Sequence, residues 1–298
     1  MPRIPDDDVK RLFLEGKTDD EIAAGYPGAD SHYVFRRRMI LRLLKRAGRK
    51  KGSGNSKQRH ASHKVASPAS MPAVDNPAFD EARTIFVSTV VDVEGLNNVF
   101  VEGKNSRKIG GRITKGPTSG FPIFTLTLEE RKTCPVCAHW RSCYGNNMHL
   151  AKRVRHGAAF EERIAAELSI LQSRFPRGFA IRLHVLGDFY SVEYVRLWES
   201  FLARFPAMFV FGFTARWRPE DPIARELIGL VMREWDTGRF RVRFSDAPVD
   251  ECSTVSIEHP RQKPADAIIC PAQTGKTESC GTCGLCWHTR RRIAFLTH

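Results

Sequence analysis

The segment FAIRLHVLGDF at residues 179–189 carries the pattern that decides the fold. Its first seven residues read as a buried strand, and Gly187 and Asp188 begin the turn that follows. Other strand-like runs lie at 84–91, 121–128, 208–214 and 240–244, with helical segments at about 146–175, 191–204 and 220–235. Strands separated by helices of this length form right-handed βαβ units, in a sheet that is open or curled into a barrel. We expect an α/β fold with a parallel (βα) sheet resembling a partial barrel.

The first fifty residues predict a small all-α module. One helix is expected from Asp8 to Leu14, a second begins at the capping box of Thr18 and Glu21, and a third runs from Ser31 to about position 47. This order resembles a helix-turn-helix, whose last helix lies in the major groove of DNA. The candidate nucleic-acid contacts are Arg36, Arg37, Arg38, Arg42, Lys45 and Arg46. A helical cap with a solvated basic face explains the same pattern.

The charge of the chain is strongly positive and unevenly spread. Its 47 Lys and Arg residues against 33 Asp and Glu leave a net charge of +14, and residues 1–64 hold +8 of it. Such an excess attracts polyanions, so DNA is the expected partner. We expect a basic module at 1–50, a flexible linker at 51–82 that is too polar to bury a core, and an α/β metal-binding domain at 83–298.

Nothing in the sequence predicts a membrane partner. It contains no run of about 18 apolar residues, and its start lacks the apolar region of a signal peptide. We expect a cytoplasmic protein, located in the host cytoplasm if a phage encodes it. The oligomeric state is left open.

Seven of the eight cysteines fall into two groups. The cysteine trio follows the strand-like run 121–128 and consists of Cys134, Cys137 and Cys143. The cysteine quartet lies near the C-terminus and consists of Cys270, Cys280, Cys283 and Cys286. Clustered thiols in a reducing compartment predict thiolate metal ligands, whereas the isolated Cys252 is expected to be a packed thiol.

The spacing within each group favours iron–sulfur clusters, one or two of the 4Fe-4S type. Cys280, Cys283 and Cys286 are evenly spaced, and such tight triples with a distant Cys-Pro hold cubane clusters in ferredoxin-type loops. Zinc is the alternative metal. The trio supplies three ligands, which leaves a coordination position for a cofactor, unless a fourth ligand or a shared centre fills it.

Polar residues follow several predicted strands. His184, Asp188 and Asp246 are candidate catalytic groups because an imidazole and carboxylates at strand ends can transfer protons. Arg216, after the strand at 208–214, suits an anionic group. The structural alternative makes Asp188 the cap of the next helix and His184 a core residue.

The end of the trio, Cys143-Tyr144-Gly145, resembles the cluster loop of radical S-adenosylmethionine enzymes, although the spacing here is C-x2-C-x5-C rather than C-x3-C-x2-C. That resemblance implies a cluster with one open iron that binds S-adenosylmethionine. Residues 110–298 also resemble a phage cysteine-rich family typified by a mycobacteriophage "gene product 88" protein. This resemblance rests on TCP at 133–135, CYG at 143–145, RLHVLGDF at 182–189 and CPAQTGKTESCGTCGLCW at 270–287.

These observations predict a phage-type, radical S-adenosylmethionine-like iron–sulfur protein that binds or acts on nucleic acid or a nucleotide. Whether it is an enzyme stays open. One alternative is a base transglycosylase-like DNA-modifying enzyme that uses Asp188 and Asp246. Its zinc ligands would be Cys280, Cys283, Cys286 and His288 or His298. Another alternative is a non-catalytic DNA-binding phage protein whose metals only hold loops together.

Overall fold

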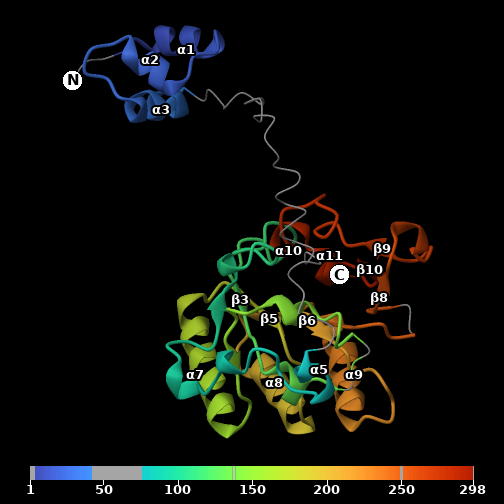
Figure 1. The fold of residues 1–298 in the computed structure, drawn as a ribbon. Helices are drawn as coiled ribbons and strands as arrows, with labels where there is room; N and C mark the ends of the chain where they lie inside the picture. Colours follow the sequence, from blue (N-terminus) through green and yellow to red (C-terminus); the bar gives the residue numbers. More distant parts are fainter. Residues whose placement is uncertain (1–3, 42–75, 136, 138, 249–250, 298) are drawn as a thin grey trace. The chain divides into compact units, whose positions relative to one another are not determined.

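The computed structural model describes residues 4–41, 76–135, 137, 139–248 and 251–297. The chain divides into two compact units, Met1–Asn55 and Ser56–His298 (Figure 1). The predicted linker lies largely outside the described residues. Its last part does not behave as a linker, because Pro77–Asp80 forms the helix α5 and Phe79 is buried.

The first unit contains three helices, α1 (Asp6–Leu14), α2 (Asp19–Ala24) and α3 (Ser31–Ile40). The predicted capping box of α2 is confirmed, since Thr18 and Glu21 satisfy each other's backbone N–H groups. Asp30, rather than Ser31, caps α3 by accepting from the backbone of Tyr33. The apolar residues Ile4, Val9, Ile22, Ala23 and Val34 form the core of this unit.

Two predicted nucleic-acid residues are engaged inside this unit. Arg37 donates to Asp6 at the start of α1, with Nη2 2.9 Å from Oδ2, and Arg38 forms a two-pronged pair with Asp19 of α2 at 2.9 Å. The Arg38 side chain is only 3% exposed, so this guanidinium ties helices together rather than facing solvent. Arg42, Lys45, Arg46 and the Arg36 side chain lie outside the described residues, and the helix-turn-helix stays a prediction.

The second unit is mixed α/β and rich in parallel strands. Its main sheet has the order β2-β3-β5-β6-β7, in which only β2 runs antiparallel. Its strands are Val101–Glu102 (β2), Ile123–Thr125 (β3), Phe179–Leu183 (β5), Met208–Thr214 (β6) and Phe240–Phe244 (β7). The helices between them are Glu130–Thr133 (α6), Ala158–Arg174 (α7), Val192–Arg204 (α8) and Pro222–Trp235 (α9).

Two small parallel sheets accompany the main one. Strands Val90–Val91 (β1) and Arg153–Val154 (β4) form a pair. Near the C-terminus, Thr254–Ile257 (β8), Ile268–Ile269 (β9) and Ile293–Leu296 (β10) form a sheet in the order β8-β10-β9. The quartet lies in this C-terminal region, on α10 (Cys280–Cys283), on α11 (Leu285–His288) and directly after β9.

Two sequence-based expectations differ from the structure. The run 84–91 forms a 3-10 turn at Val87–Thr89 and only the two-residue β1 instead of a long strand. The helix expected from position 146 begins at Ala158, because Gly157 adopts a φ of 142° and the preceding segment contains β4. That segment carries Arg153 on β4, which is buried and bonded to Glu130 of α6 and to backbone carbonyls.

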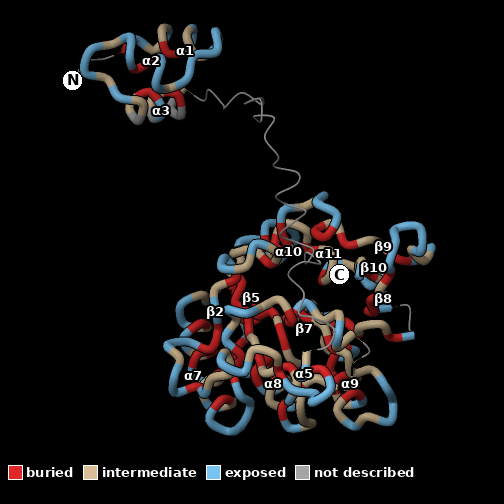
Figure 2. Tube along the Cα trace, viewed as in Figure 1, coloured by how far each residue is buried: buried red, intermediate tan, exposed pale blue. Residues whose placement is uncertain are grey.

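Alternate residues of the main strands enter different layers. Ile181, Val210 and Val242 pack against the apolar faces of α7, α8 and α9, which line one side of the sheet in Figure 1. Ala180, Phe209 and Phe211 point to the other side and pack with Trp287 of α11. Strands β3, β5, β6 and β7 are mostly buried on both faces, whereas the edge strand β2 is not (Figure 2).

Arg243 on β7 fastens the C-terminal segment to the sheet. Its side chain is fully buried and donates to the backbone carbonyls of Cys286 at 2.6 Å, Arg291 at 2.9 Å, Ser253 at 3.4 Å and Thr289. All four of these acceptors are backbone carbonyls, and burial lowers the pKa of this guanidinium. Carbonyl dipoles of the cysteine-bearing segment therefore supply the stabilisation of the charge.

Replacing Arg243 by Met should lower the free energy of unfolding of the second unit by about 3 kcal/mol, because several buried carbonyls lose their donor. Urea denaturation followed by circular dichroism measures this difference. Arg225→Met, at an exposed position of α9, is the matched control and should change stability by less than about 0.5 kcal/mol. Equal stability of the two variants would contradict the role given to Arg243.

Within the described part of the chain, no helix combines the length and the apolar character needed to cross a membrane.

Candidate metal centres

The cysteine trio lies in a compact loop that follows β3 and α6. Cys134 directly follows α6, and backbone bonds from Trp140 to Cys137 and from Cys143 to Trp140 make successive turns. All three thiols are half-buried. Burial raises the pKa of Cys134, and the charges of Asp188, Cys143 and Cys137 raise it further, which shows that these groups are neighbours.

A buried ion pair fixes both ends of this loop. Arg153 of β4 is fully buried and its Nε lies 2.9 Å from a carboxylate oxygen of Glu130 on α6. Its other nitrogens donate to the backbone carbonyls of Gly145, Met148 and Ala151 at 3.0 Å. One arginine therefore joins the residue four positions before Cys134 to the turn after Cys143.

The polar ends of three neighbouring strands form a hydrogen-bonded chain. Asp188, after β5, accepts from the hydroxyl of Thr214 and the backbone N–H of Ala215, both at 2.7 Å. Ser245, after β7, donates its N–H to the Thr214 carbonyl at 2.7 Å. Burial raises the pKa of Asp188 to about 6, against the lowering effect of its hydrogen bonds. Ser191, not Asp188, caps α8.

Asp246 reaches the trio from the other side. Its Oδ2 lies 2.6 Å from Nε2 of His139, in the middle of the trio loop, and Ser256 of β8 donates to the same carboxylate through its N–H and its hydroxyl. Asp246 adopts a φ of 51°, which is unusual for a residue other than glycine. Both candidate aspartates thus contact the chain near the trio: the backbone N–H of Asp188 donates to the hydroxyl of Thr133, the last residue of α6, and the Asp246 carboxylate pairs with His139.

Two other candidates occupy structural positions. Arg216 donates to the carbonyls of Thr133 and Phe189 and pairs with Asp221 at 2.7 Å, so it braces the trio loop. His184 is buried between the rings of Phe189 and Tyr194. Its Nε2 lies 3.2 Å from the Tyr194 hydroxyl, and its buried Nδ1 has no hydrogen-bond partner.

All four sulfur-bearing residues of the quartet line one small cavity of about 10 Å³. Residues that are neither charged nor strongly polar complete its wall, among them Leu285 and Ile293. Burial raises the pKa values of Cys270, Cys280 and Cys286, which means that these thiols need a positive partner to ionise. The indole N–H of Trp287, which also lines this cavity, is buried without a hydrogen-bond partner.

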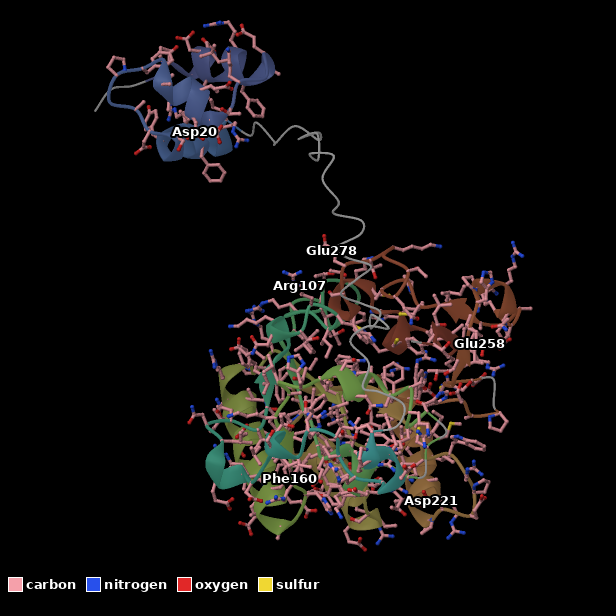
Figure 3. The ribbon with its side chains drawn as sticks, viewed as in Figure 1. Asp20, Arg107, Phe160, Asp221, Glu258 and Glu278 are labelled. Carbon is pink, nitrogen blue, oxygen red and sulfur yellow. The ribbon has the colours of Figure 1, made fainter. Side chains whose placement is uncertain are left out.

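The quartet is docked on the segment that precedes β3. The N–H groups of Cys280 and Gly281 donate to the carbonyls of Lys108 at 2.7 Å and Ile109 at 2.9 Å. Figure 3 labels Arg107 and Glu278 next to this junction. A Cβ atom at position 281 would lie 2.2 Å from the carbonyl oxygen of Arg112, so only glycine permits this close approach.

Basic residues lie between the trio and the quartet. The ammonium of Lys108 is 5.5 Å from the centre of the Tyr144 ring, directly after the trio, and its charge counteracts the raised pKa of Cys270 and Cys280. The buried Arg182 acts on both Tyr144 and Cys280 in the same way. The quartet and Tyr144, the residue after the trio, are therefore influenced by the same two cations.

The cysteine trio and the cysteine quartet carry the sulfur ligands that metal–thiolate sites use, but their side chains do not converge on one position. Among the residues that the structure describes, no three His, Cys, Asp or Glu side chains lie close enough together to hold a metal ion. Metal binding at the quartet therefore requires rotation of cysteine side chains. The N–H of Trp287, which has no partner among the described residues, could donate to a sulfur ligand of a metal bound at the quartet, since indole and amide donors commonly bond to metal-bound sulfur.

No family model, curated protein or solved structure matches this chain. The resemblances to the phage family and to radical S-adenosylmethionine enzymes therefore stay predictions, and the site has to be argued from its geometry.

Sequence reasoning missed the residues that hold the site together. Arg153 lies in a segment that the sequence predicted to be helical, and Glu130 lies in a predicted loop. Arg243 is a polar position in a strand with an alternating pattern. No local pattern marks a buried arginine whose partners are distant carbonyls. The one sequence signal for such a residue was the presence of two charges, Arg241 and Arg243, in the otherwise apolar strand FRVRF.

Burial lowers the pKa of His184 from 6.5 to about 3, with a smaller effect of Arg182. Between these values the unfolded chain binds a proton that the folded chain does not, so stability should fall as the pH drops through this window. The slope from this residue should approach 1.4 kcal/mol per pH unit. His184→Gln removes the titration and should flatten the profile. Urea denaturation between pH 7 and 4 measures it, and parallel profiles for the two proteins would contradict the burial of this imidazole.

Proposed function

We propose that this protein is an iron–sulfur protein of the radical S-adenosylmethionine-like type, in which the cysteine trio holds the chemically active centre. The observation that carries the proposal is the placement of the trio at the carboxyl end of the main parallel strands: His139 of its loop pairs with Asp246, and Thr133, directly before Cys134, accepts from the backbone N–H of Asp188. Ligands and reacting groups of α/β folds gather at this edge.

The trio and the quartet differ in a way that suits two roles. The trio offers three half-buried thiols, which leaves one coordination position for a cofactor. The quartet offers four thiols around an apolar cavity, which suits a closed, auxiliary centre. A bound cluster at the trio would supply electrons for reductive cleavage of S-adenosylmethionine. The chain itself supplies Asp188, whose ionisation near pH 6 suits transfer of a substrate proton.

The order of the main strands supports the partial-barrel form of this proposal. Strands β3, β5, β6 and β7 follow one another in the sheet in chain order, with α7, α8 and α9 in the connections. This order is the one that builds (βα) barrels. The face opposite the helices, which would be the barrel interior, carries Arg182 and Arg243 and is covered by the C-terminal segment.

We propose nucleic acid or a nucleotide as the substrate because of the net charge of +14. The pairing of Arg37 and Arg38 with carboxylates removes two of the expected phosphate contacts. The proposal therefore rests on the other basic residues of positions 1–64, not on these two.

The metal content tests the proposal. Anaerobic purification of the full chain should give a brown protein with about four irons and four sulfides per occupied cluster. Replacing the trio by serine (C134S/C137S/C143S) should remove one such set and leave the quartet's set in place. Cys252→Ser is the matched control, since Cys252 packs in the main core and belongs to neither group. Iron content that is independent of the trio would overturn its assignment.

Adding S-adenosylmethionine and dithionite to the iron-loaded protein should release 5′-deoxyadenosine, and the trio variant should release none. Chromatography of the quenched mixture measures the product. Absence of the product from a fully loaded wild-type sample would exclude the radical reaction while leaving the metal sites intact.

A zinc protein is the second candidate, and two observations favour it. The quartet cavity of about 10 Å³ has the size of a single small atom. Both aspartates that a base transglycosylase-like reaction would use also follow strands of the main sheet, Asp188 after β5 and Asp246 after β7. A colourless protein with one zinc per chain would select this alternative.

The role of the basic N-terminal residues needs a separate test. Deleting residues 1–64 should weaken binding to double-stranded DNA and reduce the slope of log K against log salt, because fewer counterions are released. Fluorescence anisotropy at several salt concentrations measures both effects, and the thermal midpoint of the second unit shows that it still folds. An unchanged slope would remove this segment from the DNA contact.

A further inference from the structure

A cavity of about 410 Å³ opens at the edge of the main sheet opposite Asp188. Its lining comes from residues that precede the parallel strands or begin them: Phe121 before β3, Arg177 before β5, Ala207 before β6 and Arg239 before β7. In a parallel sheet these starting points share one edge, and the carboxyl ends share the other. The cavity is therefore a separate site from the trio, and its volume is typical of small-molecule sites.

The charge of this cavity is positive. Arg177, Arg239 and Arg241 line it with a single carboxylate, Asp236, which is paired with Arg290. Arg239 is held in place by the carbonyls of Leu202 at 2.6 Å and Phe205 at 2.8 Å, which do not cancel its charge. An anion entering the cavity would meet an uncompensated positive field.

Two lining residues carry buried hydrogen-bonding atoms that have no partner among the residues that the structure describes, the Nε of Arg241 and the hydroxyl oxygen of Thr118. The Arg241 guanidinium lies 4.5 Å from the centre of the Trp235 ring, which fixes its plane. Burial lowers its pKa, so part of its hydration has been removed without a compensating bond. Unsatisfied donors in a cavity wall are the usual sign of a missing ligand or bound water.

The remaining wall is aromatic. Phe121, Phe209 and Trp287 line the cavity together with Pro117 and Pro206. Trp287 is anchored by Phe211, with ring centres 4.5 Å apart, so this wall is rigid. Guanidinium groups beside aromatic rings are the combination that recognises a phosphate attached to a planar base.

We infer that this cavity binds a nucleoside monophosphate, with the phosphate on Arg241 and Arg177 and the base against the aromatic wall. The inference does not depend on the metal centres, since none of the groups that would hold the phosphate belongs to the trio or the quartet. It adds a ligand site at the edge of the sheet remote from the proposed reaction.

Titration calorimetry with AMP on the full chain tests the inference. AMP should bind with a Kd below about 1 mM, and Arg241→Gln should weaken it about tenfold or more, because a charge-assisted hydrogen bond is lost. Arg177→Gln, in an exposed loop where the core is not disturbed, should weaken it about threefold or more. Arg225→Gln, an exposed arginine outside the cavity, should leave the Kd unchanged.

Adenosine and ribose 5-phosphate separate the two halves of the site, and both should bind at least about tenfold more weakly than AMP. Adenosine as tight as AMP would overturn phosphate recognition, and ribose 5-phosphate as tight as AMP would overturn recognition of the base. Equal weakening by Arg225→Gln would reveal general charge attraction and overturn the site, as would failure of AMP to bind. Metal content measured on the same samples keeps this outcome distinct from the fate of the metal centres.

Discussion

The buried guanidinium of Arg243 is the interaction on which the second unit depends. It places a charge on a buried face of the sheet, and it is stabilised by carbonyl oxygens from the C-terminal segment. Because those carbonyls belong to the chain around Cys286, this side chain helps to set the position of the quartet relative to the sheet, together with the bonds from Cys280 and Gly281 to the segment before β3. Trp287, the next residue after Cys286, is held near β7 by the same bonds and by its contact with Phe211. The hydrogen bonds of Arg243 thus join a strand to a candidate metal centre and to one wall of a cavity.

A second buried arginine does the same for the trio. Arg153 joins Glu130 to carbonyls that follow Cys143, so the two ends of the loop are held by one planar group. Both arginines act on backbone rather than on substrate. The chemistry that the site can perform is left to the cysteines and to Asp188, whose pKa of about 6 reflects its burial. This division explains why the trio can be half-exposed and still have a defined shape.

The sequence predicted the fold best where local and tertiary preferences agree. The strand Phe240–Phe244 and the helices α8 and α9 match their expected ranges closely, since each has a regular apolar period and the two helices also begin at a polar cap. The helix expected across 146–157 was wrong because Arg153 takes partners that only the folded chain supplies. Cysteine spacing separated trio from quartet, and strand ends located Asp188 and Asp246. The cavity at the opposite edge has no sequence signature, since its lining comes from many separate segments.

Trp287 faces two sites at once, because it lines both the quartet cavity and the larger cavity at the sheet edge. Any occupant that moves this indole at one site alters the energy of binding at the other. Thermodynamic linkage makes such an effect reciprocal and equal in size for the two ligands. The packing of this indole against Phe211 opposes such movement, so the stiffness of the shared wall limits the coupling between the two compartments.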